Sequence, residues 1–85
     1  MWRVAVAEGA VRSIERLPAT EQARVEDALA ALGNNPFDPV HSKGLKPSRD
    51  RRRWRVGEYR ILYTLDRKAK VAIIDDVLRR TSTTY

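Results

Sequence analysis

Arginine is the residue type in this sequence that most clearly indicates chemistry. Six of the thirteen arginines lie between Arg49 and Arg60. A guanidinium group donates hydrogen bonds in a fixed fork that suits phosphate, and it is too basic for ordinary acid–base work. A high arginine share can also come from a GC-rich genome, so the clustering matters more than the count. The cluster indicates a surface that binds a phosphate-rich polymer such as RNA or DNA.

The segment 51–63 that carries most of these arginines is predicted to form a β-hairpin. Gly57-Glu58 is a Gly-X pair between two runs rich in β-branched and aromatic residues. That combination is typical of a two-residue type II′ turn. The strand pairs that follow from it are Val56–Tyr59, Arg55–Arg60, Trp54–Ile61 and Arg53–Leu62.

Side chains alternate along a strand, so this hairpin has one apolar and one charged face. The apolar face holds Trp54, Val56, Tyr59, Ile61 and Tyr63, and the charged face holds Arg53, Arg55 and Arg60, with Leu62 among them. Like charges directly opposite each other destabilise a hairpin by up to about 1 kcal/mol. Placing Arg55 against Arg60 therefore indicates an anionic ligand. The alternative is that Arg53 and Arg55 are solvated residues that only prevent sheet aggregation.

The elements that hold this hairpin are predicted from apolar periodicity. Residues 2–6 alternate as a short strand, and a helical stripe follows at Ala7, Ala10, Val11, Ile14 and Leu17. After Pro18, a second helix is predicted over 19–32, with Gly33 as its C′ residue. Residues 34–47 are predicted as a loop, and 71–78 as the last strand. The result is a single α+β domain over 1–85 with the order β-α-α-β-β-β, in which a helical hairpin packs on one face of a small, mainly antiparallel sheet.

Composition excludes several classes of protein and site. The chain has a net charge of +6 and no cysteine, and His41 is its only histidine. We expect His41 to be an exposed loop residue. Asp75 and Asp76 are adjacent in a strand and so point to opposite faces, which argues against a metal pair. With no signal peptide or membrane span in the sequence, we expect a cytoplasmic protein without metal or cofactor.

The sequence resembles the RelE/ParE superfamily of toxins from type II toxin–antitoxin pairs, over essentially its whole length. Leu17-Pro18, Leu45-Lys46 and above all the segment 54–63 carry this resemblance. That segment is similar to the family pattern of an aromatic residue, x, Arg-Val-Gly, an acid, Tyr-Arg, an aliphatic residue, x and Tyr. The resemblance implies the same β-α-α-β-β-β fold and a cognate antitoxin as partner. It also implies operator DNA bound through the antitoxin complex.

The resemblance further implies a function and a set of site residues. RelE-type members cut mRNA on the ribosome, so a translation-inhibiting endoribonuclease is expected. The residues that would be catalytic are Arg60, Arg79 and Tyr85, and those that would bind RNA are Arg53, Arg55, Arg51, Arg52, Lys46 and Arg80. The tail departs from the family pattern, because it lacks a histidine and leaves open which of Arg79 and Arg80 is in the site.

RNA can be cut without metal when its 2′-OH attacks the adjacent phosphate, which leaves a 2′,3′-cyclic phosphate and a 5′-OH. This step needs a base, an acid and cations on the transition state. Tyr85 is the expected base, because nearby guanidinium groups should lower the pKa of its phenol from about 10. Arg60 and Arg79 or Arg80 would hold the phosphate. The alternatives are a ParE-like gyrase inhibitor without nuclease activity, and an inactive member that acts only in an autoregulatory complex with its antitoxin.

Overall fold

The computed structural model describes residues 1–48 and 50–79. Their elements are β1 (Arg3–Val6), α1 (Glu8–Glu15), α2 (Ala19–Asn34), β2 (Ser42–Gly44), β3 (Arg51–Val56), β4 (Tyr59–Asp66) and β5 (Val71–Arg79). They form one five-stranded sheet in the order β1-β5-β4-β3-β2, with β1 parallel to β5 and all other pairs antiparallel. The predicted α+β class is confirmed.

One strand, β2, was not predicted. Its three residues lie in the segment that the sequence indicated as a loop, and they pair with β3 as Ser42–Trp54, Lys43–Arg53 and Gly44–Arg52. Three residues are too few to show a period-two pattern, so nothing in the local sequence distinguishes them from a loop. The sheet is therefore one strand wider on the side of the arginine-rich hairpin.

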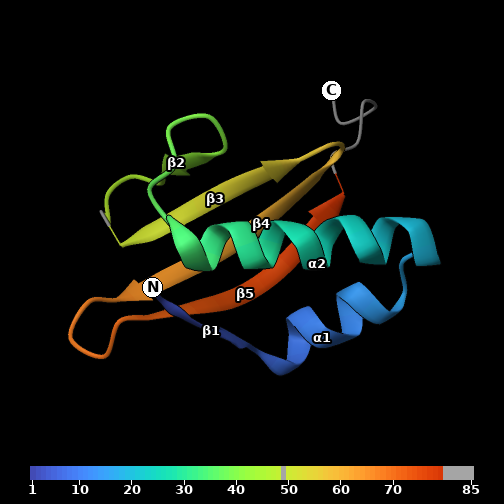
Figure 1. Cartoon of the computed structure of the whole chain (residues 1–85), viewed down its shortest axis with the longest axis horizontal. Helices are drawn as coiled ribbons and strands as arrows, with labels where there is room; N and C mark the ends of the chain where they lie inside the picture. The colour runs from blue at the N-terminus through green and yellow to red at the C-terminus, as the bar shows by residue number, and fades with distance from the viewer. Residues whose placement is uncertain (49, 80–85) are drawn as a thin grey trace.

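Both helices cover the same face of the sheet, and α2 crosses its strands while α1 lies along β5 (Figure 1). The core between the layers consists of Ala10, Val25, Ala28, Leu32, Trp54, Tyr59, Ile61, Tyr63, Leu65, Ala72, Ile74 and Val77. Of the predicted α1 stripe, Ala10 is in this core and Ile14 and Leu17 pack against it half-buried, whereas Val11 is 39% exposed. No helix in residues 1–48 and 50–79 is long and apolar enough to cross a membrane.

Gly33 does not end α2 as predicted, because the helix continues to Asn34. The glycine is buried inside the last turn, against β1. A Cβ at this position would lie 3.0 Å from Val4 Cγ2 and 3.3 Å from the Trp2 carbonyl oxygen. The Trp2 N–H donates to the Gly33 carbonyl at 2.9 Å. Glycine is therefore required here for the close approach of α2 to β1, and not for a left-handed cap.

The predicted hairpin is confirmed in turn and register. β3 and β4 pair Val56 with Tyr59, Arg55 with Arg60, Trp54 with Ile61 and Arg53 with Leu62. Gly57 has a φ of +55°, and Glu58 is not among the residues with positive φ. This excludes a type I′ turn, which needs positive φ at both positions, and agrees with type II′. The apolar face of the hairpin is the one that the helices cover.

A β-bulge interrupts the pairing of β4 with β5. Tyr63 pairs with Ile74, while its neighbour Leu62 pairs with Asp76, so Asp75 is an extra residue on β5. Ile74 and Val77 are both buried although they are three residues apart. The bulge therefore reverses the alternation of side chains over the end of β5, which changes the face on which the last residues of the strand lie.

A buried polar contact fixes the loop before β2 to the core. The Tyr63 hydroxyl donates to the Pro36 carbonyl at 2.6 Å and also contacts the Ser42 hydroxyl. Arg52 Nε donates to Ser42 Oγ at 2.7 Å. Burial raises the pKa of the Tyr63 phenol above its usual value, against the opposite effect of the hydrogen bond to Ser42 and the nearby Arg52.

Replacing Tyr63 with phenylalanine should lower stability at neutral pH and remove part of its pH dependence. The lost hydroxyl should cost about 1–3 kcal/mol. In the wild type, the unfolded chain releases the phenol proton near pH 10 while the folded chain retains it, so stability should fall from about pH 10 upward. Urea unfolding from pH 7 to 11 measures both effects. The control Tyr59→Phe should keep the alkaline decline, and an equal decline in Tyr63→Phe and wild type would contradict this assignment.

Candidate nucleic-acid interface

The face of the sheet away from the helices carries four arginines. Arg51, Arg53 and Arg55 alternate along β3 with Arg52, Trp54 and Val56, and Arg60 of β4 lies between two core residues, Tyr59 and Ile61. We call these four residues the arginine face. Arg51 and Arg55 are exposed, while Arg53 and Arg60 are half-buried. The predicted charged face of the hairpin thus exists, and the register adds Arg51 to it through its pair with Thr64.

Within residues 1–48 and 50–79, no carboxylate forms an ion pair with the arginine face. The ion pairs among the described residues are Arg12–Glu8, His41–Asp38, Arg67–Asp50 and Arg79–Glu58, and none includes a residue of this face. Arg60 Nε is shielded from solvent and has no hydrogen-bond partner among these residues. Desolvating a donor without a partner is costly, and a phosphate oxygen would relieve both this cost and the repulsion between Arg55 and Arg60.

Lys43 extends this charged surface and was not among the predicted site residues. It is exposed and pairs with Arg53, so both side chains start from the same face of the sheet. The sequence did not predict this position for Lys43, because it did not predict the strand β2 that carries it. Asp75 lies on the same side, where its carboxylate accepts a hydrogen bond of 2.7 Å from Thr64. Asp76 instead accepts from Ser13 of α1 at 2.7 Å. The two carboxylates therefore have separate hydrogen-bond partners, one on β4 and one on α1.

Two other predicted site residues, Arg52 and Lys46, do not join the arginine face. Arg52 lies on the opposite side, with Nε on Ser42 and its guanidinium carbon 5.0 Å from the centre of the Phe37 ring. Lys46 follows β2 and lines a pocket together with Arg52. Arg80 and Tyr85 lie outside the described residues. Arg51 and Arg52 were both predicted to bind RNA, but neighbouring residues of a strand point to opposite faces of the sheet.

Arg79 was predicted to lie beside Arg60, and the register places it elsewhere. It pairs with Tyr59, whose side chain is in the core, whereas Leu78 pairs with Arg60. Arg79 Nη2 lies 3.4 Å from Glu58 Oε2 in an exposed ion pair. The reason is the bulge at Asp75, because regular alternation from Ile74 would have put Arg79 on the arginine face. Arg79 and Arg60 therefore start from opposite faces of the sheet.

His41 is exposed, as predicted, but it is not without contacts. Its ring stacks on Trp54 with 4.9 Å between centroids and 6° between planes. Its Nδ1 lies 3.3 Å from Asp38 Oδ2. The pKa of Asp38 is lowered mainly by the hydrogen bond from the Val40 backbone N–H. These contacts hold the loop before β2, and with it Lys43, against the hairpin. Among the described residues, no group of three histidine or acidic side chains could hold a metal ion.

Replacing Arg55 with threonine should stabilise the fold. Removing one of two opposed charges should raise the free energy of unfolding by up to about 1 kcal/mol, and the gain should shrink as salt screens the charges. Urea unfolding at low and high salt measures both. The matched control is Arg3→Thr, which removes the same charge from an exposed position of edge strand β1. Equal gains in both variants would show a general effect of net charge and not a local repulsion.

Comparison with known proteins relates this geometry to one kind of toxin. No family model and no curated sequence matches the chain. Among solved structures, a chain of the RelBE2 toxin–antitoxin complex from Mycobacterium tuberculosis matches with a TM-score of 0.82 and 26% identity, over 93% of this chain and 98% of that one. The fold is that of the RelE toxins. The archaeal RelE–RelB complex from Pyrococcus horikoshii matches at 0.83 and 24% identity, over 96% and 98% of the two chains.

The isolated RelE toxin of E. coli matches with a TM-score of 0.84 over 99% of this chain and 89% of that one, at 15% identity. At this identity the likeness concerns the fold alone. The predicted resemblance to the RelE/ParE superfamily is thus confirmed by RelE toxins and RelBE complexes as structural neighbours.

Proposed function

We propose that this chain is a type II toxin that cuts mRNA on the ribosome, with the arginine face as its RNA-binding surface. The observation that carries the proposal is the pairing of Arg55 with Arg60 on an open sheet face, in a RelE-like fold, where neither arginine forms an ion pair with any residue that the structure describes. Such a face is destabilising until an anion binds it, and the RNA backbone supplies anions at regular intervals.

In the proposed reaction, the RNA 2′-oxygen attacks the neighbouring phosphorus while the bond from phosphorus to the 5′-oxygen breaks. Arg60 donates to the phosphate oxygens, where negative charge increases in the transition state. Arg53 and Arg55 hold the flanking phosphates. Tyr85 accepts the proton of the 2′-OH. Water protonates the leaving 5′-oxygen, so the products are a 2′,3′-cyclic phosphate and a 5′-OH. Because Arg79 starts from the other face of the sheet, we leave it out of the proposed site.

The chain has few groups for acid–base chemistry. This favours an RNA substrate whose conformation is set by another macromolecule. Bringing a 2′-OH into line with its phosphate accounts for a large part of the barrier to cleavage. A ribosome that holds the mRNA in such a conformation would supply that part. The arginine face would then contribute charge and the toxin would leave free RNA largely intact.

An antitoxin would neutralise the toxin by covering the arginine face. A segment that is acidic or amphipathic and folds on binding suits an open sheet face with four cations that form no ion pair among the described residues. Induced expression of the chain alone should stop growth, and co-expression of the open reading frame adjacent to it should restore growth. Pulse labelling with methionine should show that translation stops first. Harmless high-level expression of the intact chain would contradict the toxin proposal.

A further inference from the structure

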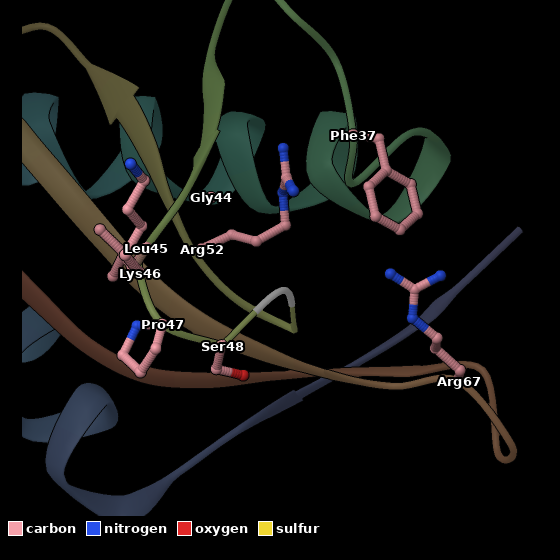
Figure 2. Close-up of a pocket in the computed structure, with 8 residues that line it drawn as sticks. All are labelled: Phe37, Gly44, Leu45, Lys46, Pro47, Ser48, Arg52 and Arg67. Carbon is pink, nitrogen blue, oxygen red and sulfur yellow. The ribbon is translucent and has the colours of Figure 1, made fainter.

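A second cluster of cations surrounds a pocket of about 400 Å³ beyond the arginine face. The pocket lies where the end of β2, the segment 45–48, β3 and the turn between β4 and β5 meet. It is lined by Phe37, Gly44, Leu45, Lys46, Pro47, Ser48, Arg52 and Arg67. Figure 2 shows the guanidinium groups of Arg52 and Arg67 on two sides of Phe37, and Lys46 at the other end of the pocket. Its volume is in the range of sites for small molecules.

Both guanidinium groups are held in place before any ligand binds. Arg52 Nε donates to Ser42 Oγ, and Arg67 Nε donates to Asp50 Oδ1, each at 2.7 Å. Their guanidinium carbons lie 5.0 and 5.3 Å from the centre of the Phe37 ring, a cation–π distance. Within residues 1–48 and 50–79, the terminal nitrogens of these two arginines make no hydrogen bond. Two oriented pairs of donors therefore point to the space beside one aromatic ring.

The charge and the walls of the pocket define the ligand. Of its three cations, only Arg67 has a carboxylate partner in the part of the chain that the structure describes, so the pocket attracts anions. A carboxylate has two oxygens and is satisfied by one guanidinium fork, whereas a phosphate offers enough oxygens for two forks. Phe37, Leu45 and Pro47 supply apolar wall next to the donors, as a flat ring requires.

We propose that this pocket binds a nucleoside phosphate, with the phosphate between Arg52 and Arg67 and the base against Phe37 and Pro47. The chemistry is the same for a free mononucleotide and for one nucleotide of an RNA chain. The proposal does not rest on cleavage by the arginine face, because the pocket contains no residue of that face. Its position at the β2 side of the sheet would let one RNA contact both surfaces.

Binding of AMP, inorganic phosphate, adenosine and a six-nucleotide oligoadenylate can be measured by calorimetry on the full-length Arg60→Ala variant, which keeps the oligonucleotide intact. AMP should bind, while adenosine and phosphate should bind at least about tenfold more weakly. Arg67→Gln should lower the affinity for AMP by at least about tenfold, since it removes a charge-assisted donor pair. Phe37→Leu should weaken AMP more than phosphate.

Asp50→Asn gives a change in the opposite direction. It removes the carboxylate that competes for Arg67, so AMP should bind about two- to fivefold more tightly. Asp27→Asn on the exposed side of α2 and Arg16→Gln at the end of α1 make the same charge changes far from the pocket, and both should leave AMP affinity nearly unchanged. Thermal melting of each variant checks that the fold is retained.

Any one of three results would overturn the proposal. The first is that AMP does not bind, and the second is that the pocket variants change AMP affinity no more than their remote controls do. The third is that an acidic peptide binds the pocket more tightly than every nucleotide. If Arg67→Gln weakens the binding of the oligonucleotide and of AMP alike, the ratio of their two affinities shows whether the natural ligand is RNA or a free mononucleotide. At least tenfold tighter binding of the oligonucleotide assigns the pocket to RNA, and equal affinity assigns it to a free mononucleotide.

Discussion

Replacing Arg60 with alanine should reduce mRNA cleavage by about 10²- to 10³-fold, the usual loss when one donor to a transition-state oxyanion is removed. The free energy of unfolding should hold or rise, because the change removes a charge opposite Arg55 and a buried Nε that has no partner among the described residues. Growth inhibition, single-turnover cleavage on ribosomes and urea unfolding measure the two effects separately.

Two further variants make the Arg60 result specific. Arg60→Lys keeps the charge but loses the planar fork, so it should retain only part of the activity. Arg16→Ala removes one cation from the end of α1, on the helical side of the fold, and should leave cleavage within about twofold, because a distant exposed charge is screened by salt. Full growth inhibition by a well-folded Arg60→Ala protein would contradict the assignment of Arg60 as the central phosphate ligand.

Replacing Tyr85 with phenylalanine should lower cleavage on the ribosome by about two to four orders of magnitude, the range expected for losing a general base. Only the phenolic oxygen is removed, so affinity for ribosomes should hardly change if the arginines supply it. Single-turnover cleavage with saturating ribosomes, together with a pelleting assay for binding, separates these two quantities.

Tyr59→Phe is the matched control for Tyr85→Phe. It also removes one phenolic oxygen, but from a side chain that is buried in the core under the helices. It should cut at the wild-type rate. If Tyr85→Phe also cuts at the wild-type rate, another group accepts the proton of the 2′-OH, and the assignment of Tyr85 as the general base is wrong.

The sequence predicted the hairpin and its charged face because the signals there are local. Gly57-Glu58 sets the turn, the turn sets the register, and alternation then assigns each side chain to a face. The resulting pairs, including Arg55 with Arg60, are those of the structure. The helices were predicted for a similar reason, since their apolar stripes repeat over several turns.

Three features could not be predicted because they depend on tertiary contacts. The bulge at Asp75 has no clear signature in the run 71–79, yet it moves Arg79 to the other side of the sheet from Arg60. The strand β2 is defined only by its pairing with β3, so the sequence did not predict that Lys43 extends the charged surface. The pocket around Phe37 joins segments that are far apart in the chain, so no local pattern predicts it, although alternation along β3 would have separated Arg52 from the arginine face.

The most direct test of the proposed function is to map the ends of an mRNA after the purified chain acts on it, with and without ribosomes. We expect new ends only when ribosomes are present, with a 5′-OH on one fragment and a 2′,3′-cyclic phosphate on the other, and far fewer of them with Arg60→Ala. A supercoiling assay with DNA gyrase, run in parallel, should show no inhibition. Intact mRNA on ribosomes together with blocked supercoiling would contradict the nuclease account and favour a gyrase inhibitor.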